Sequence, residues 1–201
     1  MELSVLEPIE MHSTFLNEVE RKSGIKVSSC FQCRKCTNGC PVTFAMDLYP
    51  DQVIRYILLG MKDEVLKSAT IWVCASCETC TTRCPNEIDI AGVMDFLKQS
   101  VVKEKVPAAE ANVLSFHKVF MDDIRRRGRI FETALVGNYM LKSGAWLQKL
   151  KDRSILEEMQ LGWAMFRKGR LNLLPKKIKG IQDIKDLFDM GNGQEARGKR
   201  Q

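Results

Sequence analysis

The sequence lacks a long apolar run. Its best candidate, VIRYILLGM at residues 53–61, is short and contains Arg55, whereas a membrane-spanning helix needs about 20 predominantly apolar residues. The first 22 residues also lack the basic segment followed by an apolar segment that is typical of a secretion signal. We therefore expect a protein with no membrane span, located in the cytoplasm.

Histidines are scarce, and the aromatic residues avoid the basic stretch. The two histidines, His12 and His117, lie far apart, so haem held between paired histidines has no support, and each is expected at the surface. The basic stretch at residues 167–180 has no aromatic after Arg167, although binders of single-stranded nucleic acid interleave aromatic and basic residues. No G-x-G-x-x-G run marks a dinucleotide site. Haem, nucleic-acid and dinucleotide binding are therefore not expected.

Cysteine, by contrast, occurs in a fixed pattern. CFQCRKCTNGCP begins at Cys30, and CASCETCTTRCP begins 44 positions later at Cys74, with every cysteine at the same offset. Both runs read C-x2-C-x2-C-x3-C-P, and together they use all eight cysteines of the chain. A tetrahedral zinc site is usually built from two separated C-x2-C pairs. Three cysteines at successive three-residue steps suit a larger group with several metal corners.

This spacing predicts two [4Fe–4S] clusters. A loop that curls around a cubane delivers thiolates to three corners, and in two-cluster ferredoxins the fourth cysteine of each run ligates the other cluster. The first cluster is then expected to be held by Cys30, Cys33, Cys36 and Cys84. The second is expected to be held by Cys74, Cys77, Cys80 and Cys40. Structural zinc and a disulfide framework are the alternatives, and disulfides would need an oxidising compartment.

Charged residues within the two runs have two interpretations. Arg34, Lys35 and Arg83 either compensate the negative charge of bound clusters or are solvated surface residues. The net charge of +6 counts protein side chains only, so the protein with its clusters would be closer to neutral. This weakens an interpretation of the basic composition as nucleic-acid binding.

Hydrophobic periodicity predicts a mainly α fold. The stretches between the two runs do not alternate like strands. Helices are expected at residues 13–23, 50–60, 62–69, 88–105, 108–128, 131–150, 154–169 and 181–190. An extended segment is expected at residues 170–180, and a flexible tail at residues 191–201. The scaffold around the clusters should therefore be helical.

The apolar positions predict which helix faces are buried. The expected inward sets are Val53, Ile54, Ile57 and Leu58; Ile90, Val93, Met94, Leu97 and Val101; and Val113, Phe116, Phe120 and Ile124. A further stripe, expected to face either the core or a partner, comprises Leu156, Met159, Trp163 and Phe166.

The paired cysteine runs, Trp72 just before the second run, PNEIDI at residues 85–90 and the length of the chain resemble the C subunit of heterodisulfide reductase. The resemblance is most specific over residues 25–105. It implies an alpha-helical ferredoxin-type domain with two [4Fe–4S] clusters and a helical C-terminal extension. It also implies an electron conduit between an A subunit that holds flavin and iron–sulfur clusters and a cysteine-rich catalytic B subunit.

The resemblance implies no catalytic residue in this chain. The chain lacks the adjacent Cys–Cys pair found in the B subunit, so we expect a non-catalytic relay subunit of an oxidoreductase complex in anaerobic metabolism. The domain organisation expected is a two-cluster domain at residues 1–105, a helical extension for partner docking at residues 106–190 and a tail at residues 191–201.

Three other functions stay open. The chain could serve a related complex, such as a sulfur-oxidising heterodisulfide-reductase-like, quinone-linked or acyl-CoA-linked oxidoreductase. A stand-alone reductase would need an open iron corner, yet all eight cysteines are assigned to eight corners. A binding module for nucleic acid would use metal only for structure and predicts zinc.

Overall fold

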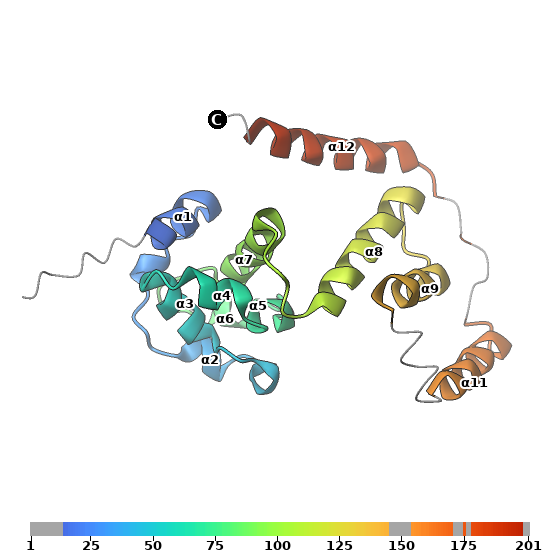
Figure 1. Ribbon diagram of the computed structural model, residues 1–201, viewed down its shortest axis with the longest axis horizontal. Helices are drawn as coiled ribbons and strands as arrows, with labels where there is room; N and C mark the ends of the chain where they lie inside the picture. Colours follow the sequence, from blue (N-terminus) through green and yellow to red (C-terminus); the bar gives the residue numbers. More distant parts are fainter. Residues whose placement is uncertain (1–13, 145–153, 171–174, 176–177, 199–201) are drawn as a thin grey trace, which may run out of the picture. The chain divides into compact units, whose positions relative to one another are not determined.

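The computed structural model describes residues 14–144, 154–170, 175 and 178–198. The chain divides into two compact units, residues 1–111 and residues 112–201. Every element labelled in Figure 1 is a helix, and the described residues contain no strand. The prediction of a mainly α fold is therefore confirmed. No helix within these residues is both long enough and apolar enough to cross a membrane.

Two helices contact most of the others in the first unit. Its helices are α1 (Thr14–Ser23), α2 (Lys35–Asn38), α3 (Pro50–Leu58), α4 (Lys62–Lys67), α5 (Thr70–Val73), α6 (Thr79–Thr82) and α7 (Ile90–Glu104), with 3-10 turns η1 (Val27–Ser29) and η2 (Thr43–Ala45). α7 contacts α1, α4, α5 and α6, and α3 contacts α1, α2 and α4. The short helices α2 and α6 lie inside the two cysteine runs and contact each other. This packing brings the two runs together.

The core of the first unit is aliphatic, as the periodicity predicts. On α7, the five expected side chains are each at most 3% exposed: Ile90, Val93, Met94, Leu97 and Val101. On α3, Val53, Ile54 and Ile57 are fully buried, and Leu58 is half-buried. Burying each such side chain contributes about 1.5–3 kcal/mol, so these two faces are the main source of cohesion in this unit.

Local signals fix where α3 and α7 begin. Pro50 occupies the first turn of α3, where its missing N–H costs nothing. Asp89 caps α7 because its carboxylate accepts a hydrogen bond from the Gly92 N–H at 2.9 Å. α7 ends at Glu104, and Lys105 then adopts a left-handed φ of 58°. The second cysteine run is therefore held directly before a capped helix.

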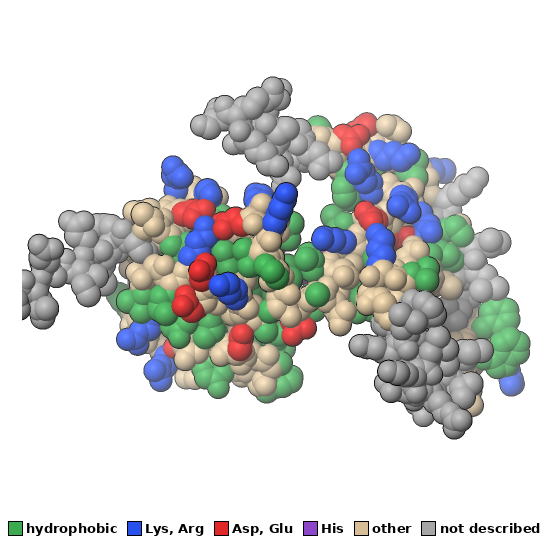
Figure 2. Space-filling view, viewed as in Figure 1, with side chains coloured by type: hydrophobic (Ala, Val, Ile, Leu, Met, Phe, Trp, Pro, Cys, Tyr) green, Lys and Arg blue, Asp and Glu red, His purple; other side chains and the backbone are tan. Residues whose placement is uncertain are grey.

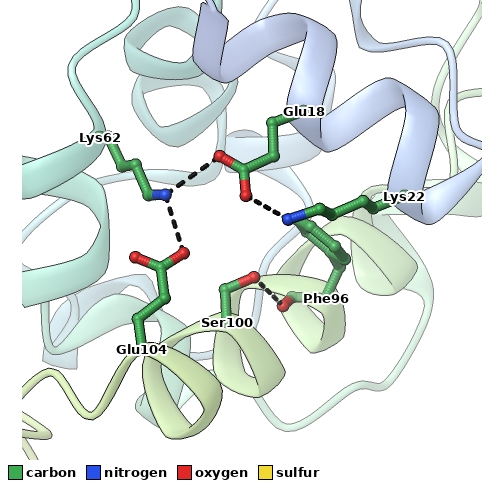
Figure 3. A network of polar contacts seen from close by, with 6 residues as sticks. All are labelled: Glu18, Lys22, Lys62, Phe96, Ser100 and Glu104. Atoms are coloured by element: carbon green, nitrogen blue, oxygen red, sulfur yellow. Dashed lines mark hydrogen bonds and ion pairs between the residues drawn. The ribbon is translucent and has the colours of Figure 1, made fainter. Parts of the chain in front are cut away.

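One lysine joins three helices of the first unit (Figure 3). Lys62 Nζ lies 3.0 Å from Glu18 Oε2 of α1 and 2.8 Å from Glu104 Oε1 of α7. The hydrogen bond from Lys22, at 2.5 Å, together with Lys62 lowers the pKa of Glu18. Burial acts to lower the pKa of Lys62, but the hydrogen bonds to Glu104 and Glu18 raise it overall. The network fixes the start of α4 against α1 and α7.

The second unit contains four described helices. These are α8 (Ala111–Arg127), which begins at the boundary, α9 (Glu132–Ser143), α11 (Ser154–Arg167) and α12 (Ile181–Gly198). The Phe116 ring meets the edge of the Tyr139 ring at 5.7 Å, and Lys142 Nζ lies 2.8 Å from Asp122 Oδ2. These contacts join α8 to α9.

Burial on α8 differs from the prediction. Phe116, expected to face inward, is 40% exposed, and Val113, Phe120 and Ile124 are half-buried. The buried side chains are those of Val119 and Asp123. Asp123 turns inward because its carboxylate accepts hydrogen bonds from Arg127 and from the Phe131 N–H, the latter at 2.8 Å. A pattern of apolar residues does not reveal a buried carboxylate of this kind.

The C-terminal part is more helical than expected. α12 continues to Gly198, past Met190, after which we expected a tail. Gly191 and Gly193 weaken a helix by about 1 kcal/mol each, but no proline interrupts residues 181–198. The predicted extended segment at residues 170–180 lies largely outside the described residues, as do His12 and the side chains of Leu156 and Met159. The domain boundaries after residues 105 and 190 stay a prediction.

Candidate iron–sulfur site

The two cysteine runs form loops around two cavities. The first cavity is lined by Cys30, Cys33 and Cys36 of the first run and by Cys84 of the second. The second cavity is lined by Cys74, Cys77 and Cys80 of the second run and by Cys40 of the first. Each cavity thus gathers three thiols from one run and the fourth thiol of the other.

Both cavities suit a multi-iron group better than a single ion. Within the described part of the chain, no three His, Cys, Asp or Glu side chains gather as a group that could hold one metal ion. Four thiols that lie apart along the lining of one cavity match the separate iron corners of a cubane. The donor set and its spread therefore fit a [4Fe–4S] cluster in each cavity.

Each loop has two residues in left-handed backbone conformation at equivalent positions. Gln32 and Arg34 have φ of 55° and 62°, and Ser76 and Glu78 have φ of 51° and 59°. This conformation costs about 1–2 kcal/mol for a residue that carries a side chain. Such backbone turns can make concave sets of N–H groups that bind anions, and the Gln32 N–H donates to Cys30 Sγ at 3.4 Å. The loops are therefore shaped to direct N–H groups toward sulfur.

A threonine in each loop anchors the loop to the helix that follows it. Thr37 Oγ1 donates to the Asp51 carboxylate of α3 and accepts from the Asp51 N–H at 3.1 Å. Its equivalent, Thr81 Oγ1, donates to Asp89 Oδ1 at 3.1 Å and accepts from the Ala91 N–H at 3.2 Å. The two loops are thus fixed by the same pair of hydrogen bonds at their respective helix starts.

The N-termini of α3 and α7 lie between the two cavities. Asp51 lines the first cavity while the preceding Pro50 lines the second, and Ile90 lines the first while Ala91 lines the second. Because consecutive residues face different cavities, the two cavities adjoin. The N-terminal end of a helix favours negative charge, so both helices are placed to stabilise anionic clusters.

Asp47 holds the entry to the second run. Its carboxylate accepts from the Ala69 N–H at 2.7 Å, from the Thr70 N–H at 2.9 Å and from Thr70 Oγ1 at 2.7 Å. Burial acts to raise the pKa of Asp47, but these hydrogen bonds and one from the Leu48 N–H lower it. On the other side of this run, Lys98 Nζ donates to the Cys74 carbonyl at 3.0 Å. Cys74 is thus positioned by the Asp47 contacts to the residues before it and by the hydrogen bond from Lys98.

The environments of the thiols differ between the surface and the interior. Burial raises the pKa of the Cys36 thiol to about 11 and also raises the pKa of Cys80. A hydrogen bond with Thr79, at 3.4 Å, lowers the pKa of the exposed Cys77. Because a metal binds the thiolate, the buried cysteines release protons when iron is bound.

Sequence reasoning missed several residues that shape this site. Gln32, Ser76 and Glu78 give no glycine signal for their left-handed conformation, and Arg34 is predicted only as a charge beside the cluster. Asp47 reaches Thr70 only in the folded chain. Trp72 lies in the core at 4% exposed and does not line either cavity. Arg34 and Lys35 line the first cavity, whereas Arg83 lines neither.

Comparison with known proteins identifies the cysteine-rich segment. Residues 26–88 match the family of 4Fe-4S dicluster domains. The chain is 28% identical over 102 residues to the C subunit of the H(2):CoB-CoM heterodisulfide,ferredoxin reductase of Methanothermobacter marburgensis, a match that covers 51% of this chain and 55% of that protein.

Two further relatives carry similar names. The iron-sulfur C 2 subunit of the CoB--CoM heterodisulfide reductase of Methanocaldococcus jannaschii is 28% identical over 134 residues, covering 63% of this chain and 68% of the relative. The C2 subunit of the H(2)/formate:CoB-CoM heterodisulfide,ferredoxin reductase of Methanococcus maripaludis is 30% identical over 118 residues, covering 55% and 60%. The chain thus spans about half to two thirds of the length of these relatives. The resemblance to the C subunit is confirmed, as is the cofactor, two [4Fe–4S] clusters.

Proposed function

We propose that this chain is the electron-transfer subunit of a heterodisulfide reductase or a related complex. It relays electrons between an A-type subunit with flavin and iron–sulfur clusters and a cysteine-rich B-type subunit that carries out the chemistry. The names of the relatives support this subunit assignment. The cytoplasm is the compartment that we propose for the complex.

The observation that carries the proposal is the exchange of cysteines between the two cavities. We assign Cys30, Cys33, Cys36 and Cys84 to the first cluster, and Cys74, Cys77, Cys80 and Cys40 to the second. The linings of the two cavities support these ligand sets. Because each run completes the site of the other, neither cluster site closes without both loops, and the two clusters are held side by side as a relay requires.

The residues around the cavities support a conduit rather than a catalytic centre. Bound [4Fe–4S] clusters would each supply one-electron transfer. The chain contributes thiolates, N–H donors and two helix N-termini, and all eight cysteines are used as ligands. On the face drawn in Figure 2, basic and acidic side chains are interspersed, which does not favour a nucleic-acid surface.

Metal analysis and reconstitution test the proposal. Protein purified without oxygen should contain about eight iron and eight acid-labile sulfides per chain, the sum of two cubanes. Stoichiometric zinc without labile sulfide would contradict the assignment. Mixed with A-type and B-type subunits of a heterodisulfide reductase, the chain should be required for electrons to pass from reduced flavin to the B-type subunit. Equal transfer in its absence would overturn the relay.

A further inference from the structure

Each cysteine loop reaches the surface at one equivalent position. Cys33 and Cys77, the second cysteines of the two runs, are exposed, whereas the other six are half-buried or buried. A cluster held by these loops therefore comes nearest to solvent beside Cys33 in the first cavity and beside Cys77 in the second. Electrons exchanged with another protein would cross at these two places.

The surroundings of these two cysteines differ in chemistry. Around Cys33 lie Phe31, Arg34 and Lys35, which we call the aromatic–basic rim. The Phe31 side chain is 76% exposed, the Arg34 side chain is 72% exposed, and Lys35 is exposed as well.

At the equivalent positions around Cys77 lie Ala75, Glu78 and Thr79, which we call the acidic rim. The cationic Arg34 is thus replaced by the anionic Glu78, and the large ring of Phe31 by a methyl group. Both Arg34 and Glu78 have the same left-handed backbone, so the two charges leave the backbone at matching places in the two loops.

The charges on the two rims are available to a partner. Lys35 and Glu78 form no ion pair with any residue whose side chain the structure describes. Arg34 Nε lies 3.6 Å from Asp51 Oδ2, but Asp51 is buried and most of the Arg34 side chain is in solvent. Unpaired charges around a docking site steer association and exclude partners of like charge. An exposed aromatic ring is a typical anchor for a pocket on the partner.

We propose that the aromatic–basic rim docks a protein partner that presents carboxylates around an apolar pocket for the Phe31 ring. Glu78 on the acidic rim repels the same partner, so this partner exchanges electrons through the first cluster and not through the second. This proposal rests on the relay proposed above. It adds that the first cluster exchanges electrons with the acidic partner. The charges of the two rims then decide which cluster each partner meets.

Site-specific photocrosslinking in the intact complex tests the proposal. A photoreactive phenylalanine analogue is placed at Phe31 in one variant and at Ala75 in another, in the chain assembled with the A-type and B-type subunits proposed above. The crosslink from position 31 should fall in a peptide rich in Asp and Glu, and the subunit that it reaches should differ from the one reached from position 75. The yield from position 31 should drop as salt rises.

Charge variants provide the matched controls. Arg34→Glu with Lys35→Glu should lower the crosslink from position 31 by about tenfold. The milder pair Arg34→Gln with Lys35→Gln should lower it less, and it replaces the charge reversal if that variant does not fold. Glu78→Lys, which removes the repulsion at the acidic rim, should not raise the crosslink from position 31. Crosslinks from both positions to one subunit, to a second copy of this chain, or insensitive to these changes would overturn the proposal. Iron and labile sulfide measured on the same samples, together with electron transfer from reduced flavin to the B-type subunit, separate this failure from loss of the clusters and from failure of the relay itself.

Discussion

The side chain of Arg83 fills the space in which Gly39 would carry a Cβ atom. A Cβ built on Gly39 lies 2.6 Å from Arg83 Cδ and 3.0 Å from Arg83 Nε. The two residues hold the same position in the two runs, directly before Cys40 and Cys84. Gly39 has a negative φ of −98°, so a side chain at this position would meet the Arg83 side chain rather than an unfavourable backbone conformation.

Gly39→Ala should therefore loosen the junction between the loops. The added methyl group must displace the far end of the exposed Arg83 side chain, which can move aside, so we expect a loss of stability of less than about 1 kcal/mol. Because Cys40 and Cys84 follow these residues and each completes the other loop's site, both clusters should be lost faster to an iron chelator. Loss of absorbance from the clusters under anaerobic conditions measures this rate.

A double variant identifies the cause. Adding Arg83→Ala to Gly39→Ala removes the contact, so the rate of cluster loss should return toward that of the wild type, with a coupling of about 0.5 kcal/mol between the two changes. If Gly39→Ala alone behaved as the wild type, or if the double variant were no better than Gly39→Ala, the packing argument would be wrong.

Cys40→Ala should damage the second cluster more than the first. The second cavity is lined by Cys40 together with Cys74, Cys77 and Cys80, so the loss of this thiol removes a ligand from the site of the other run. Electron paramagnetic resonance of the reduced protein should show the same signal weakened in Cys40→Ala and in Cys74→Ala. A Cys40→Ala spectrum that matched Cys30→Ala would mean that each run encloses its own cluster.

Ser76→Gly should be tolerated, whereas Ser76→Val should not. Ser76 has a φ of 51°, which glycine adopts freely and a β-branched residue adopts poorly. We expect Ser76→Gly to retain full iron content with stability unchanged or raised by up to about 1 kcal/mol. Ser76→Val should lose iron. The matched control is Ala75→Val, since Ala75 does not have positive φ. Equal iron content in both valine variants would contradict the role of backbone conformation.

Much of this architecture follows from spacing in the sequence. Every apolar position predicted on α7, from Ile90 to Val101, is buried, because a 3.6-residue period and a cap at Asp89 are local properties. The grouping of the eight cysteines also follows from local spacing, since three ligands on one loop leave the fourth corner to the other run.

The remaining features depend on contacts between distant segments. Asp47 hydrogen-bonds with Thr70 across 23 residues, and neither residue belongs to a motif. On α8, Asp123 is buried by its partners Arg127 and Phe131 while Phe116 stays exposed. The left-handed backbone of four loop residues follows from the path of each loop around its cavity. The types of these residues do not predict this conformation.

Glu18→Gln should destabilise the protein at neutral pH and much less in acid. The pKa of Glu18 is lowered by Lys22 and Lys62, so its ionised form stabilises the fold above its ordinary value of 4.5 and this contribution disappears as pH falls through the lowered pKa. For such a partly exposed network we expect about 1 kcal/mol at pH 7. Denaturant unfolding of wild type and Glu18→Gln, compared as a difference at each pH, measures it.

Lys62→Met tests the basic member of the same network, whose contribution to stability is lost at high pH. The pKa of Lys62 is raised from its ordinary 10.5 by Glu104 and Glu18, so its contribution should be constant through neutral pH and be lost as pH rises through the raised pKa. In acid it is lost together with the charge of the two carboxylates. The difference in free energy of unfolding between wild type and Glu18→Gln should shrink in acid. A difference that stayed the same from pH 7 to well below the ordinary pKa of Glu would contradict the network shown in Figure 3.

Truncation after Gly169 should release partners while the clusters stay bound. All eight cysteines lie in the first unit, within residues 30–84, whereas the second unit exposes large apolar side chains on α11. Trp163 is 64% exposed and Phe166 is 43% exposed, with their rings in contact at 5.8 Å. Exposed apolar surface of this kind is typical of a docking face, and we predict that residues beyond 169 and α11 together hold another subunit.

The alternative is that these segments stabilise the chain itself, because α12 also contacts α8 through Arg125 and Asp189 at 3.1 Å. The pair Trp163→Ala and Phe166→Ala separates the two roles, since it leaves α12 in place. If α11 and the residues beyond 169 together dock a subunit, both the truncated chain and the double variant should keep about eight iron per chain and lose co-purification with the A-type or B-type subunit. Lost iron or aggregation with co-purification intact would assign these segments a purely structural role.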